Sequence, residues 1–160
     1  MMLKELEPMA SKLNQAREML KKTLGALTEE QIVALQVNAH WSVKDQVAHL
    51  AAANRGMFGI AQRMAKGETP QLPEGYDNDV YNARQVAKRK EKSLAEICAE
   101  IDATHSELLA FLEGLMPEQL MMMGEHPLFG QVVLRDLLVI IYTHQINHCN
   151  EISTKIQGSK

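Results

Sequence analysis

The sequence has few cysteines and no excess of basic residues. Its 160 residues include two cysteines, Cys98 and Cys149, which are far apart and form no CxxC pair. A disulfide-stapled secreted fold is therefore excluded, and we expect two buried thiols in a reducing compartment. The formal net charge is -3 and the pI about 6.1, so the chain lacks the basic surface typical of nucleic-acid binding. The basic run 84–92 is interrupted by Glu91 and is expected to be a solvated helix face, so no nucleic-acid partner is predicted.

Long apolar runs are also missing. The longest, Leu137 to Tyr142, is far shorter than the roughly 20 residues that cross a bilayer. The first residues, Met1 to Glu5, are amphipathic and lack the apolar segment of a secretory signal. We therefore predict a cytoplasmic protein without a membrane partner. Its length suits a single domain, 1–160, with a core of its own.

Apolar residues recur at alternating spacings of three and four, which predicts amphipathic helices. The expected long helices are 3–24, 43–66, 83–114 and 131–156, with a short helix at 28–35 and a short turn at 116–120. The fold class predicted is all-α: a four-helix bundle with a long crossover loop, 67–82, between helices two and three. That loop contains Gly and Pro without any period, and it serves either as a connection along the bundle or as a lid over a site.

Local signals place several helix starts. Thr28 to Gln31 and Ser42 to Asp45 are capping-box patterns. Pro8 falls in the second turn of the first predicted helix, so the true start is expected to be later or slightly kinked. The helix 131–156 is apolar around most of its circumference, which indicates burial on more than one side. It is either the central helix of the bundle or also a dimer interface, and from this excess of apolar surface we predict a homodimer.

Two histidines on this last helix are the first candidates for a functional site. His144 and His148 lie one turn apart and point the same way, so they could share a metal ion. An unpartnered buried imidazole costs about 1 to 3 kcal/mol, so the pair requires a metal, a polar hydrogen-bond network or a water-filled cavity. His49 lies at the edge of the apolar stripe of helix 43–66. Small neighbours at Ala52, Ala53 and Gly56 leave room over His49 for a solvent molecule or ligand.

Taken together, these features resemble the DinB/YfiT-like superfamily over about residues 3–156. The resemblance rests on Trp41-Ser42 followed by His49, on the asparagine and basic residues of Asn82 to Arg89 after a Pro-containing loop, and on His144-x-x-x-His148. It implies a four-helix bundle with a long crossover and a divalent metal held by His49, His144 and His148. Members of the family include thiol S-transferases and isomerases that use a low-molecular-weight thiol such as bacillithiol or mycothiol.

Three neutral imidazoles leave the charge of a divalent ion uncompensated and its coordination incomplete, which is typical of catalytic sites. Zinc or nickel suits nitrogen ligands best, whereas iron or manganese usually also takes a carboxylate. Glu151 is expected to orient an imidazole rather than to bind the metal. The predicted function is a metal-dependent hydrolase or thiol S-transferase, with water or a thiol as nucleophile and a small-molecule substrate. The alternative is a non-catalytic, metal-binding, stress-associated bundle.

Other polar and aromatic residues have weaker claims to a role. His105 is expected to be a buried, hydrogen-bonded histidine rather than a fourth ligand or proton shuttle. His40 and His126 lie in connectors and are expected to be exposed. Trp41 either packs over the start of helix 43–66 or forms a wall of the site. Tyr142 points away from His144 on the helical wheel and is given no catalytic role.

Overall fold

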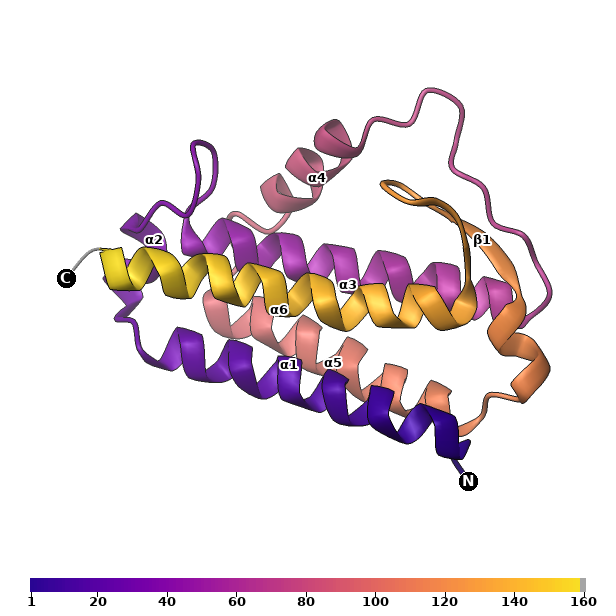
Figure 1. Cartoon of the computed structure of the whole chain (residues 1–160). Helices are drawn as coiled ribbons and strands as arrows, with labels where there is room; N and C mark the ends of the chain where they lie inside the picture. Colours follow the sequence, from indigo (N-terminus) through magenta and orange to yellow (C-terminus); the bar gives the residue numbers. More distant parts are fainter. Residues whose placement is uncertain (159–160) are drawn as a thin grey trace.

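The protein is an all-α four-helix bundle, as the sequence predicts. A computed structural model describes residues 1–158. The bundle helices are α1 (Glu7–Gly25), α3 (Val43–Ala65), α5 (Leu94–Glu113) and α6 (Leu134–Gly158). They form a ring in which α1 contacts α6, α6 contacts α3, α3 contacts α5 and α5 contacts α1 (Figure 1).

Both predicted capping boxes are confirmed, and the first helix begins later than Leu3. A 3-10 turn, Lys4–Leu6, precedes α1, and Pro8 lies in the first turn of that helix, where its missing N–H is tolerated. The short helix α2 (Glu29–Ala34) has the predicted capping box on Thr28. The second capping box opens α3: the Ser42 hydroxyl accepts from the Asp45 N–H, and the Asp45 carboxylate accepts from the Ser42 N–H.

The prediction of one helix over 83–114 is wrong. The structure has α4 (Asn78–Ala87), then turns, then α5 from Leu94. The break is set by Ser93, whose hydroxyl accepts from the Glu96 N–H at 3.2 Å while its own N–H donates to the Glu96 carboxylate at 2.7 Å. This capping box fixes a new helix start there.

The crossover does travel along the bundle. Following the chain in Figure 1, α3 and α5 run in the same direction, so the chain has to return between them. The loop 66–77 and α4 make this return, and α4 contacts α3. They lie on the side of the bundle away from α1 and α5 (Figure 1).

A short β-hairpin precedes α6, which begins at Leu134 and not at 131 as predicted. After a 3-10 turn, Pro117–Met121, strand β1 (Met123–His126) pairs antiparallel with β2 (Gly130–Val133). His126 is opposite Gly130, and Gly130 has a φ of +66°, which a glycine adopts without a steric penalty. The hairpin curves over the same side of the bundle as α4 (Figure 1).

Helix α6 is buried within the chain itself. It contacts α1, α3, the hairpin and the 3-10 turn before it. Within residues 1–158, none of the exposed large apolar side chains belongs to α6. The excess apolar surface that suggested a homodimer is thus accounted for by intrachain packing, and the homodimer stays a prediction. No helix in the same range is long and apolar enough to span a membrane.

The two cysteines differ in burial. Cys149 on α6 is fully buried, as expected, and burial raises the pKa of its thiol to about 11. Cys98 on α5 is only partly buried, so the expectation of two buried thiols holds for Cys149 alone. Neither thiol is in a disulfide.

Candidate metal centre

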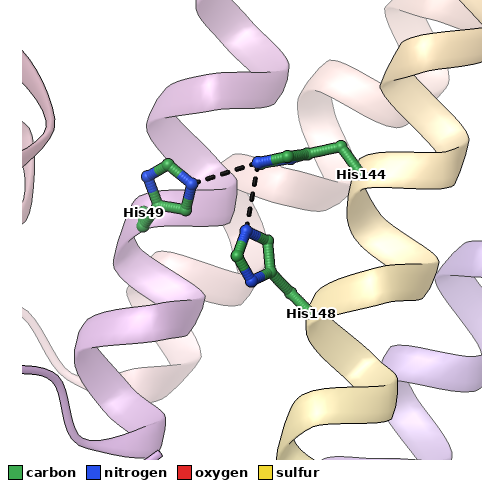
Figure 2. A group of neighbouring side chains, drawn as sticks. All are labelled: His49, His144 and His148. Atoms are coloured by element: carbon green, nitrogen blue, oxygen red, sulfur yellow. Dashed lines mark hydrogen bonds between the residues drawn. The ribbon is translucent and has the colours of Figure 1, made fainter. Parts of the chain in front are cut away.

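Three histidines from two helices converge at one point. His49 projects from α3, and His144 and His148 project from successive turns of α6 (Figure 2). The Nε2 atom of His144 lies 3.1 Å from the Nε2 of His49 and 3.1 Å from the Nε2 of His148. His144 and His148 were predicted from their spacing and His49 from the family resemblance, and the structure brings the three side chains together.

Each of these two distances fits two imidazole nitrogens on one divalent ion. With metal–nitrogen bonds of about 2.0 to 2.1 Å, two ligand nitrogens are about 2.9 Å apart at a right angle and about 3.3 Å apart in a tetrahedron. A hydrogen-bonded cluster fits less well, because the Nε2 of His144 has either one proton or one lone pair. That atom cannot make a good ring hydrogen bond to both neighbours at once.

Burial keeps the imidazoles of His49 and His144 neutral. Burial, followed by the proximity of His148, lowers the pKa of His49 to about 4. The same two causes, with a further contribution from His49, lower the pKa of His144 to about 3. Both rings are therefore uncharged at neutral pH, and their lone pairs are available to a cation.

A polar network contacts the Nδ1 side of the His148 ring. Its Nδ1 donates to the Glu151 carboxylate at 2.8 Å, one turn further along α6. Gln46 of α3 donates to the same carboxylate and lies 2.6 Å from the His148 Nδ1. The predicted contact between Glu151 and an imidazole is thus present. It fixes the tautomer of His148 so that the Nε2 lone pair faces the other two histidines.

The three imidazoles form one end of a cavity of about 760 Å³. Two helical stripes make its floor, each with members three and four residues apart. The α3 stripe is His49, Ala52, Ala53, Gly56, Met57 and Ile60, and the α6 stripe is Ile140, Thr143, His144, Asn147, His148 and Glu151. The small residues expected to leave room over His49 do line this space.

The crossover and the hairpin supply the rest of the wall. The crossover contributes Leu72, Pro73, Tyr76, Asn78, Tyr81 and Asn82, and the hairpin contributes His126, Pro127, Leu128 and Phe129. The two segments are tied together, because the Glu125 N–H donates to the Pro70 carbonyl at 2.9 Å and the Leu72 N–H to the Glu125 carboxylate at 2.8 Å. The crossover thus connects the ends of the bundle and also covers the site.

Of the remaining candidates, one residue lines the cavity and the other three lie outside it. Trp41 forms a wall of the cavity, with its ring centroid 4.9 Å from that of His49. His40 is exposed, as expected. His105 is half-buried and hydrogen-bonded to Asn14 at 2.9 Å, away from the three converging histidines. Tyr142 lines a separate small void next to His105 and is not part of the cavity.

The expectation that His126 is exposed is wrong. Its side chain is 7% exposed and lines the cavity. Its Nδ1 accepts the Leu128 N–H at 3.1 Å, which leaves the ring proton on Nε2, and burial lowers its pKa. His126 therefore gives the cavity wall a neutral N–H donor. The sequence does not predict the burial of His126, because the residue was assigned to an irregular connector and the structure places it in a strand.

Comparison with solved structures identifies similar folds. YfiT from Bacillus subtilis, described as a probable metal-dependent hydrolase with an unusual four-helix bundle topology, is 18% identical with a TM-score of 0.81. The match covers 99% of this chain and 90% of YfiT. A mycothiol-dependent maleylpyruvate isomerase is 10% identical with a TM-score of 0.77, covering 92% of this chain but 60% of the isomerase.

The colibactin self-resistance protein ClbS, solved in complex with double-stranded DNA, is 16% identical with a TM-score of 0.71. This match covers 92% of the chain and 93% of ClbS. At these identities the likeness establishes the fold alone. No curated protein matches the sequence. The sequence itself matches the DinB superfamily over residues 12–152, a range that contains the bundle core, the crossover and all three converging histidines, and the chain therefore belongs to the DinB superfamily.

Proposed function

We propose that this protein is a metal-dependent enzyme in which His49, His144 and His148 bind one divalent ion and a small-molecule electrophile is attacked in the adjoining cavity. The observation that carries the proposal is the convergence of three Nε2 atoms at the end of a cavity large enough for a substrate. Zinc or nickel suits the all-nitrogen donor set best; iron or manganese would be expected to recruit a carboxylate as well.

When bound, the ion would supply a Lewis acid that lowers the pKa of water or of a thiol enough to give a nucleophile at neutral pH. The chain's own residues prepare the site for it. Burial keeps His49 and His144 neutral, and Glu151 and Gln46 hold His148 in one orientation. Trp41 packs beside His49 in the cavity wall.

The reaction classes that fit are hydrolysis and transfer of a low-molecular-weight thiol. The named relatives provide support for both, since one is described as a probable metal-dependent hydrolase and another as a mycothiol-dependent isomerase. The alternative is a non-catalytic metal-binding bundle. The cavity supports the enzyme over the non-catalytic bundle, because a purely structural metal site is closed and does not need an adjoining space of about 760 Å³.

Metal analysis tests the ligand set. The protein is purified without added ions and its metal content measured, together with His49→Ala and His148→Ala. We expect about one ion per chain in the parent and little in either variant, while circular dichroism shows that all remain folded. His40→Ala is the matched control, because His40 is exposed and lies outside the site.

Turnover separates the enzyme from the non-catalytic alternative. The metal-loaded parent is assayed for hydrolysis of esters, lactones and epoxides, and for conjugation of an electrophile with added thiols. Activity that disappears in His49→Ala but persists in His40→Ala supports the proposal. A stoichiometric ion without any turnover supports the non-catalytic bundle, and absence of metal under several loading conditions rejects both.

A further inference from the structure

The cavity is long and its two ends differ in chemistry. His49 and Ile60 lie on one stripe of α3, eleven residues apart, which corresponds to about 16 Å along a helix. On α6 the order is reversed, with Ile140 toward the Ile60 end and His148 toward the His49 end, because the two helices are antiparallel (Figure 1). The cavity therefore has a histidine end and a distal end.

The distal end is apolar. Ile60 and Ile140 form its floor, and the crossover and the hairpin add Leu72, Leu128 and Phe129 to the cavity wall. Leu128 and Phe129 are 69% and 62% exposed. Large apolar side chains that are exposed next to a cavity mark the place where an apolar ligand would cover them.

Charge is almost absent from the wall. Among the lining residues that the structure describes, Glu151 is the only charged side chain, and no lysine or arginine contributes. Glu151 lies at the histidine end and is already engaged by His148 and Gln46. The polar groups that remain are uncharged, such as the amides of Asn82 and Asn147 and the Nε2–H of His126. A carboxylate or phosphate on the ligand body would find no cation to pair with, and burying it unpaired is costly.

Resting on the metal-dependent function above, we propose that the substrate is an uncharged small molecule with an extended apolar body that lies in the distal end. The cavity rejects molecules that carry a carboxylate or phosphate on that body. Its reactive group lies at the histidine end, where the Asn147 amide, next to His148 on α6, provides hydrogen bonds. A thiol co-substrate with carboxylates would have to keep them outside the cavity.

Binding of a matched pair of probes tests this without turnover. Phenylbutanamide and phenylbutanoate have the same size and differ in charge. Trp41 is the only tryptophan in the chain and lies in the cavity wall, so its fluorescence reports occupancy. Titrations use the full-length protein as purified and after chelator treatment, with circular dichroism to verify folding. We expect the amide to bind at least about tenfold more tightly than the carboxylate in the chelator-treated protein.

Adding a cation to the cavity wall should reduce this preference. Phe129→Lys places an ammonium at an exposed position of the wall, where folding is not at risk, and Ile60→Lys places one deeper on α3. Either variant is expected to bind the carboxylate more tightly than the parent does, by about tenfold. Phe129→Leu and Ile60→Met are the matched uncharged controls and should keep the preference for the amide.

Equal affinity for the two probes, tighter binding of the carboxylate to the parent, or no uptake of either probe at millimolar concentration would overturn the proposal. Its failure is distinguishable from failure of the metal-dependent function. If metal is absent but the amide still binds more tightly than the carboxylate, the preference of the cavity for uncharged ligands is supported and the metal-dependent function is not. If metal and turnover are present but the preference is not, only the substrate class is wrong.

Discussion

At the scale of single residues, burial determines what the histidine cluster can do. An exposed imidazole with a pKa near 6.5 is partly protonated at neutral pH. His49 and His144 are desolvated, with pKa values of about 4 and about 3, so they have lone pairs free. Two of the three donors are therefore ready for a cation without releasing protons, which favours metal binding at neutral pH.

His148 is positioned by Glu151, and this contact yields a residue-scale prediction. Glu151→Gln keeps the size of the side chain but weakens the acceptor for the His148 Nδ1–H. We expect metal affinity to fall by about 10- to 100-fold, as is typical when a partner of a ligating imidazole is removed. Competition with a chromophoric chelator measures the affinity.

Asp136→Asn is the matched control for Glu151→Gln. It removes the same charge from an exposed position in the first turn of α6. An equal loss of affinity in the two variants would mean that only the overall charge matters and that the orienting role of Glu151 is wrong.

The sequence revealed the histidines unevenly. His144 and His148 stand out because two imidazoles one turn apart on an apolar helix require an explanation. His49 has no such signal of its own and was assigned to the site through the family resemblance. His126 was missed, because its burial depends on a hairpin whose two four-residue strands are too short to show an alternating pattern.

At the scale of secondary-structure elements, the hairpin docks on α3 through Gly124. A Cβ at this position would lie 2.7 Å from the Met64 Sδ and 3.2 Å from the Pro70 Cγ. Met64 is fully buried and Pro70 is rigid, so neither can move aside easily. The same docking places Leu128 and Phe129 over the cavity.

Gly124→Ala is therefore expected to destabilise the protein by about 1 to 3 kcal/mol through overpacking. It should also weaken binding of apolar probes, because the hairpin is displaced. Urea unfolding and the Trp41 titration measure the two effects. The control is Gly59→Ala, in the interior of α3 with no atom within 4 Å of the added methyl, which should be neutral or stabilising by up to about 1 kcal/mol. Equal effects at both positions would argue against tight docking at Gly124.

The helix boundaries show which signals in the sequence are sufficient to predict where a helix begins. Thr28 and Ser42 precede clear apolar stripes, and both capping boxes occur in the structure as predicted. Ser93 begins a capping box of the same kind, but it lies inside a longer pattern that reads as continuous helix. The break depends on that capping box, which the spacing of apolar residues does not reveal.

At the scale of the whole molecule, the proposed metal would link α3 to α6 on the side of the bundle that the crossover and the hairpin cover. A ligand that binds only the folded state stabilises it by about 2.7 kcal/mol at a free concentration of 100 times its Kd. For a chain of this length, this corresponds to a decrease in Tm of about 5 to 10 °C when the metal is removed. Differential scanning fluorimetry with and without a chelator measures the shift.

His49→Ala provides the control for metal removal. Because this variant lacks one of the three proposed ligands, its Tm should be almost unaffected by the chelator. The same decrease in His49→Ala and in the parent would indicate that the chelator acts elsewhere, and it would contradict the link between the two helices.

Acid stability of the metal-free protein follows from the same histidines. Their pKa is about 6.5 in the unfolded chain, but about 4 for His49 and about 3 for His144 in the folded state. Below about pH 6.5 the two histidines bind protons in the unfolded chain but stay neutral in the folded chain. Their contribution to the free energy of unfolding is therefore fully present above that pH and is lost as the pH falls toward 4. Two such groups steepen the dependence by up to about 2.7 kcal/mol per pH unit.

Urea unfolding of the chelator-treated protein at several pH values between about 7 and 4 measures this slope. Carboxylates also contribute to the acid dependence. The pKa of Asp102, for example, is lowered by its hydrogen bond from Arg17, so protonating it in acid destabilises the folded protein. The contribution of the histidines therefore has to be isolated. The double variant His49→Gln, His144→Gln keeps the carboxylates and removes the two buried imidazoles, so its slope should be shallower than that of the parent between pH 6 and 4. Identical slopes would mean that folding does not lower the pKa values of the two imidazoles, so that burial gives the site no advantage in binding a cation below about pH 6.5.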